Sequence, residues 1–149
     1  MYILLSMARE PAPSACVCSS LRMATRVVAR HYDRALAPTG LTTNAYSLLS
    51  RLEREGAQTV GSLAAGLAMD RTTLSREIAP LVERGLVISR PGERDRRQRV
   101  LAVSRSGTAV VKRARPLWAK AQADLEGTFG VERTDGLMAE LHGLIGAAA

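Results

Sequence analysis

Residues Thr59–Ser104 read TVGSLAAGLAMDRTTLSREIAPLVERGLVISRPGERDRRQRVLAVS, a pattern of two short helices followed by two strands. We expect the first helix to begin after Thr59, because its hydroxyl can accept a hydrogen bond from a free backbone N–H group. Leu63, Ala64 and Leu67 then recur at the spacing of one helical face. The sequence therefore predicts a short amphipathic helix at the start of this stretch.

A second helix is predicted to begin after Asp70, since a carboxylate there caps the helix and lies at the positive end of its dipole. Apolar residues follow with helical period, and Gly85 stands where helices commonly end. The exposed side chains of its first turns can donate to phosphates and to base edges, as a helix in the major groove of DNA must. These candidate DNA-binding residues are Arg71, Thr72, Thr73, Ser75 and Arg76. The alternative for Thr73 is a side chain partly turned inward, and the alternative for Arg76 is a phosphate anchor or a bond within the domain instead of base reading.

Beyond Gly85 the apolar pattern becomes that of β-strands. Leu86–Arg90 and Arg99–Val103 are rich in β-branched and apolar residues, and we expect them to pair as a hairpin. Two strands with a basic tip after a helix-turn-helix form a winged helix-turn-helix, whose wing can reach an adjacent minor groove. The candidate residues at the tip of the wing are Arg94, Asp95, Arg96 and Arg97.

The order and spacing of these motifs resemble the MarR family of bacterial transcription regulators. The resemblance is carried by T-V-G-S-L-A, D-R-T-T-L-S-R, L-V-E-R-G-L-V, D-R-R and L-A-V-S, and it extends over about Cys16 to Gly146. It implies a homodimer that binds a pseudo-palindromic operator in double-stranded DNA, usually as a repressor. It also implies release from DNA by a small-molecule effector or by an oxidant.

Within this resemblance Arg97 takes the place of the wing arginine. Asp95 matches the acidic residue that orients this arginine through a charge-assisted bond, while Arg94 and Arg96 would contact phosphates. The alternative for the Asp95–Arg97 pair is a staple within the hairpin that makes no contact with DNA.

Further helical patterns flank the motif on both sides. They are Cys16–Leu36, a helix capped by Thr42 that runs to about Arg54, a long helix from Ser106 and Gly107 to about Thr128, and a last helix from about Glu132.

The expected fold class is therefore mainly α with a small β-wing. We expect a single domain over residues 15–149, preceded by a poorly ordered leader at residues 1–14. Residues 15–37 and 106–149 are predicted to be dimerisation helices, and residues 42–104 the DNA-binding lobe.

Cys16 and Cys18 are candidates for an oxidant switch. They are the only cysteines and lie at the start of the first predicted helix, where the helix dipole stabilises a thiolate. Cys18 precedes Tyr32 by fourteen residues, the spacing of the reactive cysteine and a tyrosine in the hydroperoxide-sensing branch of the family. The other two tyrosines of that branch would fall at Arg22 and Thr43, so the set is incomplete. A thiol sensor and two inert thiols both remain open.

The resemblance also implies an effector pocket between the first helix, the long helix and the DNA-binding lobe. Arginines there can hold a carboxylate, and aromatic side chains can stack on a ring. Ordinary packing or surface exposure is the alternative for each of them. The candidates are Arg22, Arg26, His31, Tyr32, Tyr46 and Trp118.

The formal net charge of +7 on 149 residues favours a polyanionic partner. No apolar run approaches the ~20 residues that cross a membrane, so we expect a cytoplasmic protein without membrane contact. Catalytic and metal-ligand motifs are missing, which predicts no enzyme activity, no cofactor and no metal. Two rival interpretations are a nucleoid-type protein with little sequence preference and a protein-interaction module that no longer binds DNA.

Overall fold

A computed structural model describes residues 16–148, so the predicted leader at residues 1–14 lies outside the described residues. Within them no helix is long and apolar enough to cross a membrane. The elements are α1 (Val17–Leu36), the 3₁₀ helix η2 (Ala37–Thr39), α2 (Thr43–Glu55), β1 (Gln58–Thr59), α3 (Val60–Gly66), α4 (Arg71–Glu83), β2 (Val87–Pro91), β3 (Arg99–Val103), α5 (Arg105–Phe129) and α6 (Val131–Ala148).

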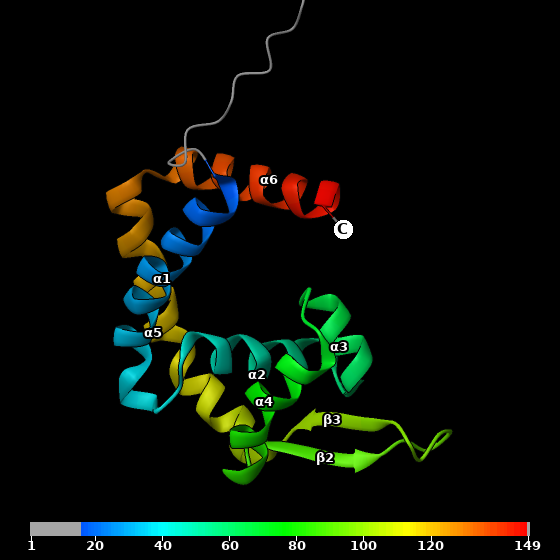
Figure 1. Cartoon of the computed structure of the whole chain (residues 1–149). Coiled ribbons are helices and arrows are strands. Elements are labelled where there is room, and N and C mark those ends of the chain that lie inside the picture. The colour runs from blue at the N-terminus through cyan, green and yellow to red at the C-terminus, as the bar shows by residue number, and fades with distance from the viewer. Residues whose placement is uncertain (1–15, 149) are drawn as a thin grey trace, which may run out of the picture.

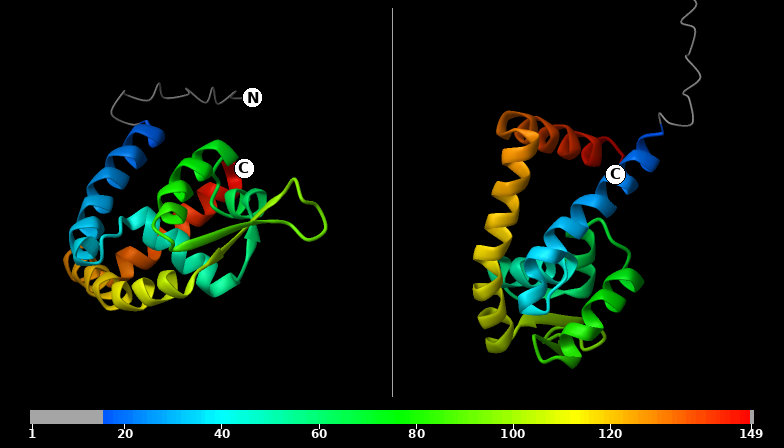
Figure 2. Two further views of the ribbon diagram at one scale, coloured as in Figure 1. Left: turned by 90° about the horizontal axis from the view of Figure 1, so that it is seen from below. Right: turned by 90° about the vertical axis from the view of Figure 1, so that its left-hand side faces the viewer.

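The elements form a lobe and a helical frame, which consists of α1, α5 and α6 (Figure 1). The lobe contains α2, α3, α4 and a small antiparallel sheet of strand order β1-β3-β2. The helix α5 leaves the sheet, packs against α1 and leads into α6. The right-hand view of Figure 2 shows α1 and α5 diverging toward α6. The prediction of a mainly helical fold with a small β-wing is therefore confirmed.

The helices α2, α3 and α4 begin where the sequence predicts, and a side chain caps each of them. Thr42, Thr59 and Asp70 each accept a hydrogen bond from the backbone N–H group three residues later, at 3.2, 3.1 and 2.8 Å. Each bond satisfies an N–H group that has no partner inside the helix. At the other end of α4, Gly85 takes a φ of +68°, the left-handed conformation in which helices often terminate.

The strand β2 begins one residue later than the sequence pattern predicts. The backbone N–H group of Leu86 still bonds the carbonyl oxygen of Leu81 at 2.8 Å, so Leu86 belongs to the turn that ends α4. Pairing with β3 runs from Val87 opposite Val103 to Pro91 opposite Arg99.

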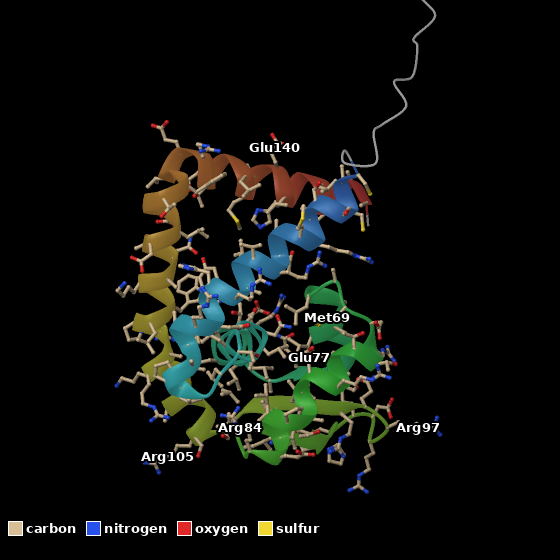
Figure 3. All side chains as sticks on the ribbon, turned by 60° about the vertical axis from the view of Figure 1, so that its left-hand side comes forward. Met69, Glu77, Arg84, Arg97, Arg105 and Glu140 are labelled. Carbon is tan, nitrogen blue, oxygen red and sulfur yellow. The ribbon has the colours of Figure 1, made fainter. Side chains whose placement is uncertain are left out.

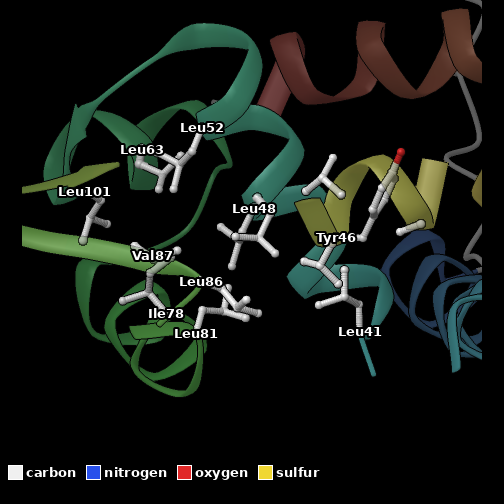
Figure 4. Close-up of a cluster of buried hydrophobic side chains, with 14 of the residues drawn as sticks. Leu41, Tyr46, Leu48, Leu52, Leu63, Ile78, Leu81, Leu86, Val87 and Leu101 are labelled. Carbon is white, nitrogen blue, oxygen red and sulfur yellow. The ribbon is translucent and has the colours of Figure 1, made fainter. Parts of the chain in front are cut away.

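A core of leucine and other apolar side chains holds the lobe together (Figure 4). Leu48 of α2, Leu63 of α3, Leu81 of α4 and Leu101 of β3 are each at most 2% exposed. Burying one such side chain contributes about 1.5–3 kcal/mol. Since these leucines come from four elements, the core fixes the helix-turn-helix against the sheet.

The start of α5 lies against the base of the hairpin. The hydroxyl of Ser104 accepts the N–H group of Gly107 at 3.0 Å and donates to the carbonyl oxygen of Gly85 at 2.6 Å. A Cβ on Gly107 would lie 2.7 Å from Cγ2 of Val103 and still closer to the carbonyl oxygen of Leu86. Only glycine allows α5 to approach the sheet this closely.

Gly107→Ala should therefore destabilise the protein, because the new methyl group meets backbone that cannot move away. We expect a loss of about 1–3 kcal/mol in the free energy of unfolding, measured by urea denaturation. The matched control is Gly127→Ala in the same helix, where a Cβ meets no atom within 4 Å. That change should stabilise the protein by about 0.5–1 kcal/mol, and equal midpoints for both variants would contradict the steric argument.

The turn of the wing depends on a second close approach. The N–H group of Gly92 donates to the carbonyl oxygen of Gln98 at 2.8 Å, and that of Gln98 donates to the carbonyl oxygen of Asp95 at 3.1 Å. A Cβ on Gly92 would lie 2.7 Å from the same oxygen of Asp95. A side chain at this position would force the turn open.

In Gly92→Ala we expect the backbone amides of residues 92 and 98 to exchange hydrogen faster than in the wild type. The lobe core is remote from this turn, so the urea midpoint should fall less than in Gly107→Ala. Hydrogen exchange measures the first effect, with the exposed neighbour Glu93→Ala as control. Wild-type exchange rates in Gly92→Ala would show that the turn tolerates a side chain.

Candidate nucleic-acid interface

The first turns of α4 present the predicted recognition residues to solvent. Leu74 and Ile78 of the same helix are buried in the lobe core, which fixes the helix face that remains outside. The residues on the exposed face are Arg71, Thr72, Thr73, Ser75 and Arg76.

Two of these residues use their hydroxyl protons within the helix. The hydroxyl of Thr73 donates to the carboxylate of Asp70 at 2.6 Å, and that of Ser75 donates to the carbonyl oxygen of Arg71 at 2.7 Å. The bond from the Thr73 hydroxyl, followed by that from its backbone N–H group, lowers the pKa of Asp70. Thr73 and Ser75 are therefore weaker candidates for donating to DNA than the two arginines.

The wing tip carries four exposed candidates, and Figure 3 shows Arg97 extending from the end of the hairpin. The expected bond between the Asp95 carboxylate and the Arg97 guanidinium is not what the structure shows. Instead, Asp95 accepts the backbone N–H group of Arg97 at 3.0 Å. An aspartate readily bonds a backbone N–H group two residues later, so this carboxylate shapes the turn. The other two exposed residues at the tip are Arg94 and Arg96.

An aromatic column joins the helical frame to the lobe. The ring of Trp118 in α5 stacks between Tyr32 of α1 and Tyr46 of α2, with centroid distances of 6.4 and 6.0 Å. The hydroxyl of Tyr32 donates to Gln122, and burial, followed by the charge of Glu126, raises the pKa of Tyr32.

The Nε2 atom of His31 lies 2.8 Å from the carbonyl oxygen of Ala121. Like Tyr32, His31 therefore takes part in the packing of α1 on α5.

A pocket of about 670 Å³ lies beside this column, between α2, α5 and the end of α3. Tyr46 and Trp118, two of the candidate effector-binding residues, line it, whereas no residue of α1 does, so His31 and Tyr32 are not part of its wall. Arg22 and Arg26 do not line this pocket, and both are exposed on α1. The cations in its wall are Arg51, Arg54 and Arg115.

Glutamates already hold these three arginines. Arg115 pairs with Glu53, while Arg51 and Arg54 bond Glu55 at 2.9 and 3.1 Å. Hydrogen bonds from Gln58 first, and then from Arg54 and Arg51, lower the pKa of Glu55. The spacing of Arg51 and Glu55 along one helix could have indicated their pair, whereas nothing in the sequence indicates the contact of Arg115 with α2.

Cys16 and Cys18 are exposed thiols at the start of α1, where the sequence predicts them. Within residues 16–148 no three His, Cys, Asp or Glu side chains come together as a group that could hold a metal ion.

Comparison with known proteins shows the family to which the chain belongs. The profile of the MarR family matches residues 39–98. An uncharacterized HTH-type transcriptional regulator of Mycobacterium leprae is 34% identical over 99 residues, which are 66% of this chain and 69% of the relative. The transcriptional activatory protein BadR of Rhodopseudomonas palustris is 36% identical over 80 residues, 52% of this chain and 46% of its own.

The solved structures of two regulators match most of the fold. The transcriptional regulator MosR of Mycobacterium tuberculosis, crystallised with DNA, is 33% identical with a TM-score of 0.78, over 89% of this chain and 98% of MosR. The transcriptional repressor CouR, bound to a 23-mer DNA duplex, is 25% identical with a TM-score of 0.79, over 89% and 94%. The chain belongs to the MarR family of winged-helix transcriptional regulators, which bind DNA and are not enzymes.

Proposed function

We propose that the protein is a homodimeric, sequence-specific repressor that a small-molecule effector releases from its operator. The observation that carries the DNA-binding part is that Arg71 of α4 and Arg97 of the wing line one groove on the lobe. A recognition helix and a wing on the same side can engage a major groove and the adjacent minor groove together.

The homodimer is supported by apolar side chains left uncovered on the helical frame. Val27 of α1, Leu137 of α6 and Ile145 of α6 are 56, 47 and 59% exposed. Residues 15–37 and 106–149 would then form the dimer region, and residues 42–104 the lobe. A two-fold dimer would present two recognition helices about one turn of DNA apart, matching a pseudo-palindromic operator.

The effector site is proposed at the pocket beside Trp118. Its walls come from α2 of the lobe and from α5 of the frame, so an occupant that fits only one arrangement of these helices would change the spacing of the two lobes. Small aromatic acids are the first compounds to test, because Trp118 and Tyr46 offer ring faces. Repression is proposed because the similar protein CouR is a transcriptional repressor, and activation is the alternative because BadR is a transcriptional activatory protein.

The test is a titration of the protein with its own upstream intergenic DNA and with random DNA, at ~150 mM salt, a concentration that reduces non-specific phosphate binding. We expect clear preference for the upstream DNA. Arg97→Ala should weaken that binding by about 1–3 kcal/mol and leave the unfolding midpoint unchanged, because the side chain is exposed. Arg113→Ala on α5 controls for net charge. Equal affinity for both DNAs would favour a nucleoid-type protein, and unchanged binding by Arg97→Ala would remove the wing from the interface.

Oxidant sensing by Cys18 is the second candidate, favoured by the exposure of this thiol in the first turn of α1. If the pocket is the switch, peroxide should leave operator affinity unchanged, while an effector should shift the fluorescence of Trp118, the single tryptophan, as it releases DNA. If Cys18 is the sensor, peroxide should release DNA from the wild type and not from Cys18→Ser. Release by peroxide in both proteins would exclude Cys18.

A further inference from the structure

A groove of about 470 Å³ lies between α3, α4 and the wing, and we name it the basic groove. Three arginines line it, Arg71 from α4 and Arg97 and Arg99 from the wing, together with uncharged residues such as Gly61 and Ser62 of α3. No Asp or Glu is among the described residues that line it.

The charge of the basic groove differs from that of the pocket beside Trp118. The three arginines of that pocket are each paired with a glutamate. In the basic groove the hydrogen bonds of Arg99 go to Ser89, which is uncharged. Three like charges that line one groove repel one another, and a bound anion offsets this repulsion. The groove is therefore suited to an anion.

The position of the groove identifies which anion it takes. If α4 enters a major groove and the wing enters the adjacent minor groove, the DNA strand that separates the two grooves must pass between α4 and the wing. The basic groove occupies that place in the fold. The occupant that fits is a phosphodiester of this strand, and this step rests on the proposed function.

Arg71 points into the groove from the start of α4. A Cβ on Gly61 would lie 3.2 Å from a terminal nitrogen of the Arg71 guanidinium and 3.5 Å from its Nε. The guanidinium thus lies across α3, in the space that the missing side chain of Gly61 leaves. Arg76, which is also exposed on α4, is not part of the lining of the groove.

We propose that Arg71 anchors the phosphodiester between the two DNA grooves and does not read bases, and that Gly61 provides the room for its guanidinium. Base reading on α4 then falls to Arg76. Phosphate contacts strengthen binding to all sequences and add to its salt dependence, whereas base contacts strengthen binding to the operator alone. This difference makes the two roles separable by experiment.

The experiment measures the affinities of Arg71→Ala and Arg76→Ala for the operator and for random DNA between 50 and 200 mM salt. For Arg71→Ala we expect both affinities to fall by a similar factor, and the slope of log K against log salt to become shallower by about 1. For Arg76→Ala we expect a loss of about tenfold or more on the operator only. Arg113→Ala again controls for the loss of one charge.

A gain of negative charge tests the same site from α3. Gly61→Asp places a carboxylate beside the Arg71 guanidinium, in the first turn of a helix where an acidic residue is tolerated. We expect an unchanged melting temperature, weaker binding to every DNA, and little further loss when Arg71→Ala is added.

A selective loss of operator binding by Arg71→Ala, at an unchanged salt slope, would overturn the proposal and make Arg71 a base-reading residue. Losses from Gly61→Asp and Arg71→Ala that simply add would also count against it. A wild-type protein that binds no DNA would instead overturn the proposed function itself.

Discussion

The hydroxyl group of Ser104 makes the contact on which the arrangement of the molecule depends. It bonds Gly85, where α4 ends, and Gly107, where α5 begins, while the backbone N–H group of Ser104 bonds Leu86 at 3.0 Å. The end of α4, the base of the wing and the start of α5 therefore meet at one residue. Their relative directions are set there, because each bond satisfies a backbone group at the end of an element.

A second connection ties the lobe to α1. The carboxylate of Asp33 accepts both the N–H group and the hydroxyl of Thr43, at 2.6 and 2.7 Å, at the first residue of α2. The stacked rings of Tyr32, Trp118 and Tyr46 connect α1, α5 and α2. Since α2 is held by α1 and α5, two of the three helices of the frame, we expect a displacement of α2 to be transmitted to the surface through which we propose the protein dimerises.

The features that could be predicted from the sequence are those that depend on residues close together along the chain, such as the ends of helices. Asp70 and Gly85 mark both ends of α4 because caps and left-handed residues act within one turn. Contacts between distant segments have no characteristic sequence pattern. The position of the Arg71 guanidinium beside Gly61 and the pairing of Arg115 with Glu53 therefore could not be predicted from the sequence. The role of Asp95 shows a further limit of prediction from the sequence, since a carboxylate can bond either a backbone or a side-chain donor two residues later.

The construction of the wing separates folding from recognition. Its base and its turn are fixed by backbone contacts at Gly107 and Gly92, positions that no other residue fills without displacing the chain. The side chains of Arg94, Arg96 and Arg97 between them are exposed, and the fold does not use them for its core. Substitutions at the tip are therefore nearly free of folding cost. If the wing contacts DNA as proposed, these contacts can change by substitution while the scaffold stays the same, which makes the wing tip an evolvable part of the molecule.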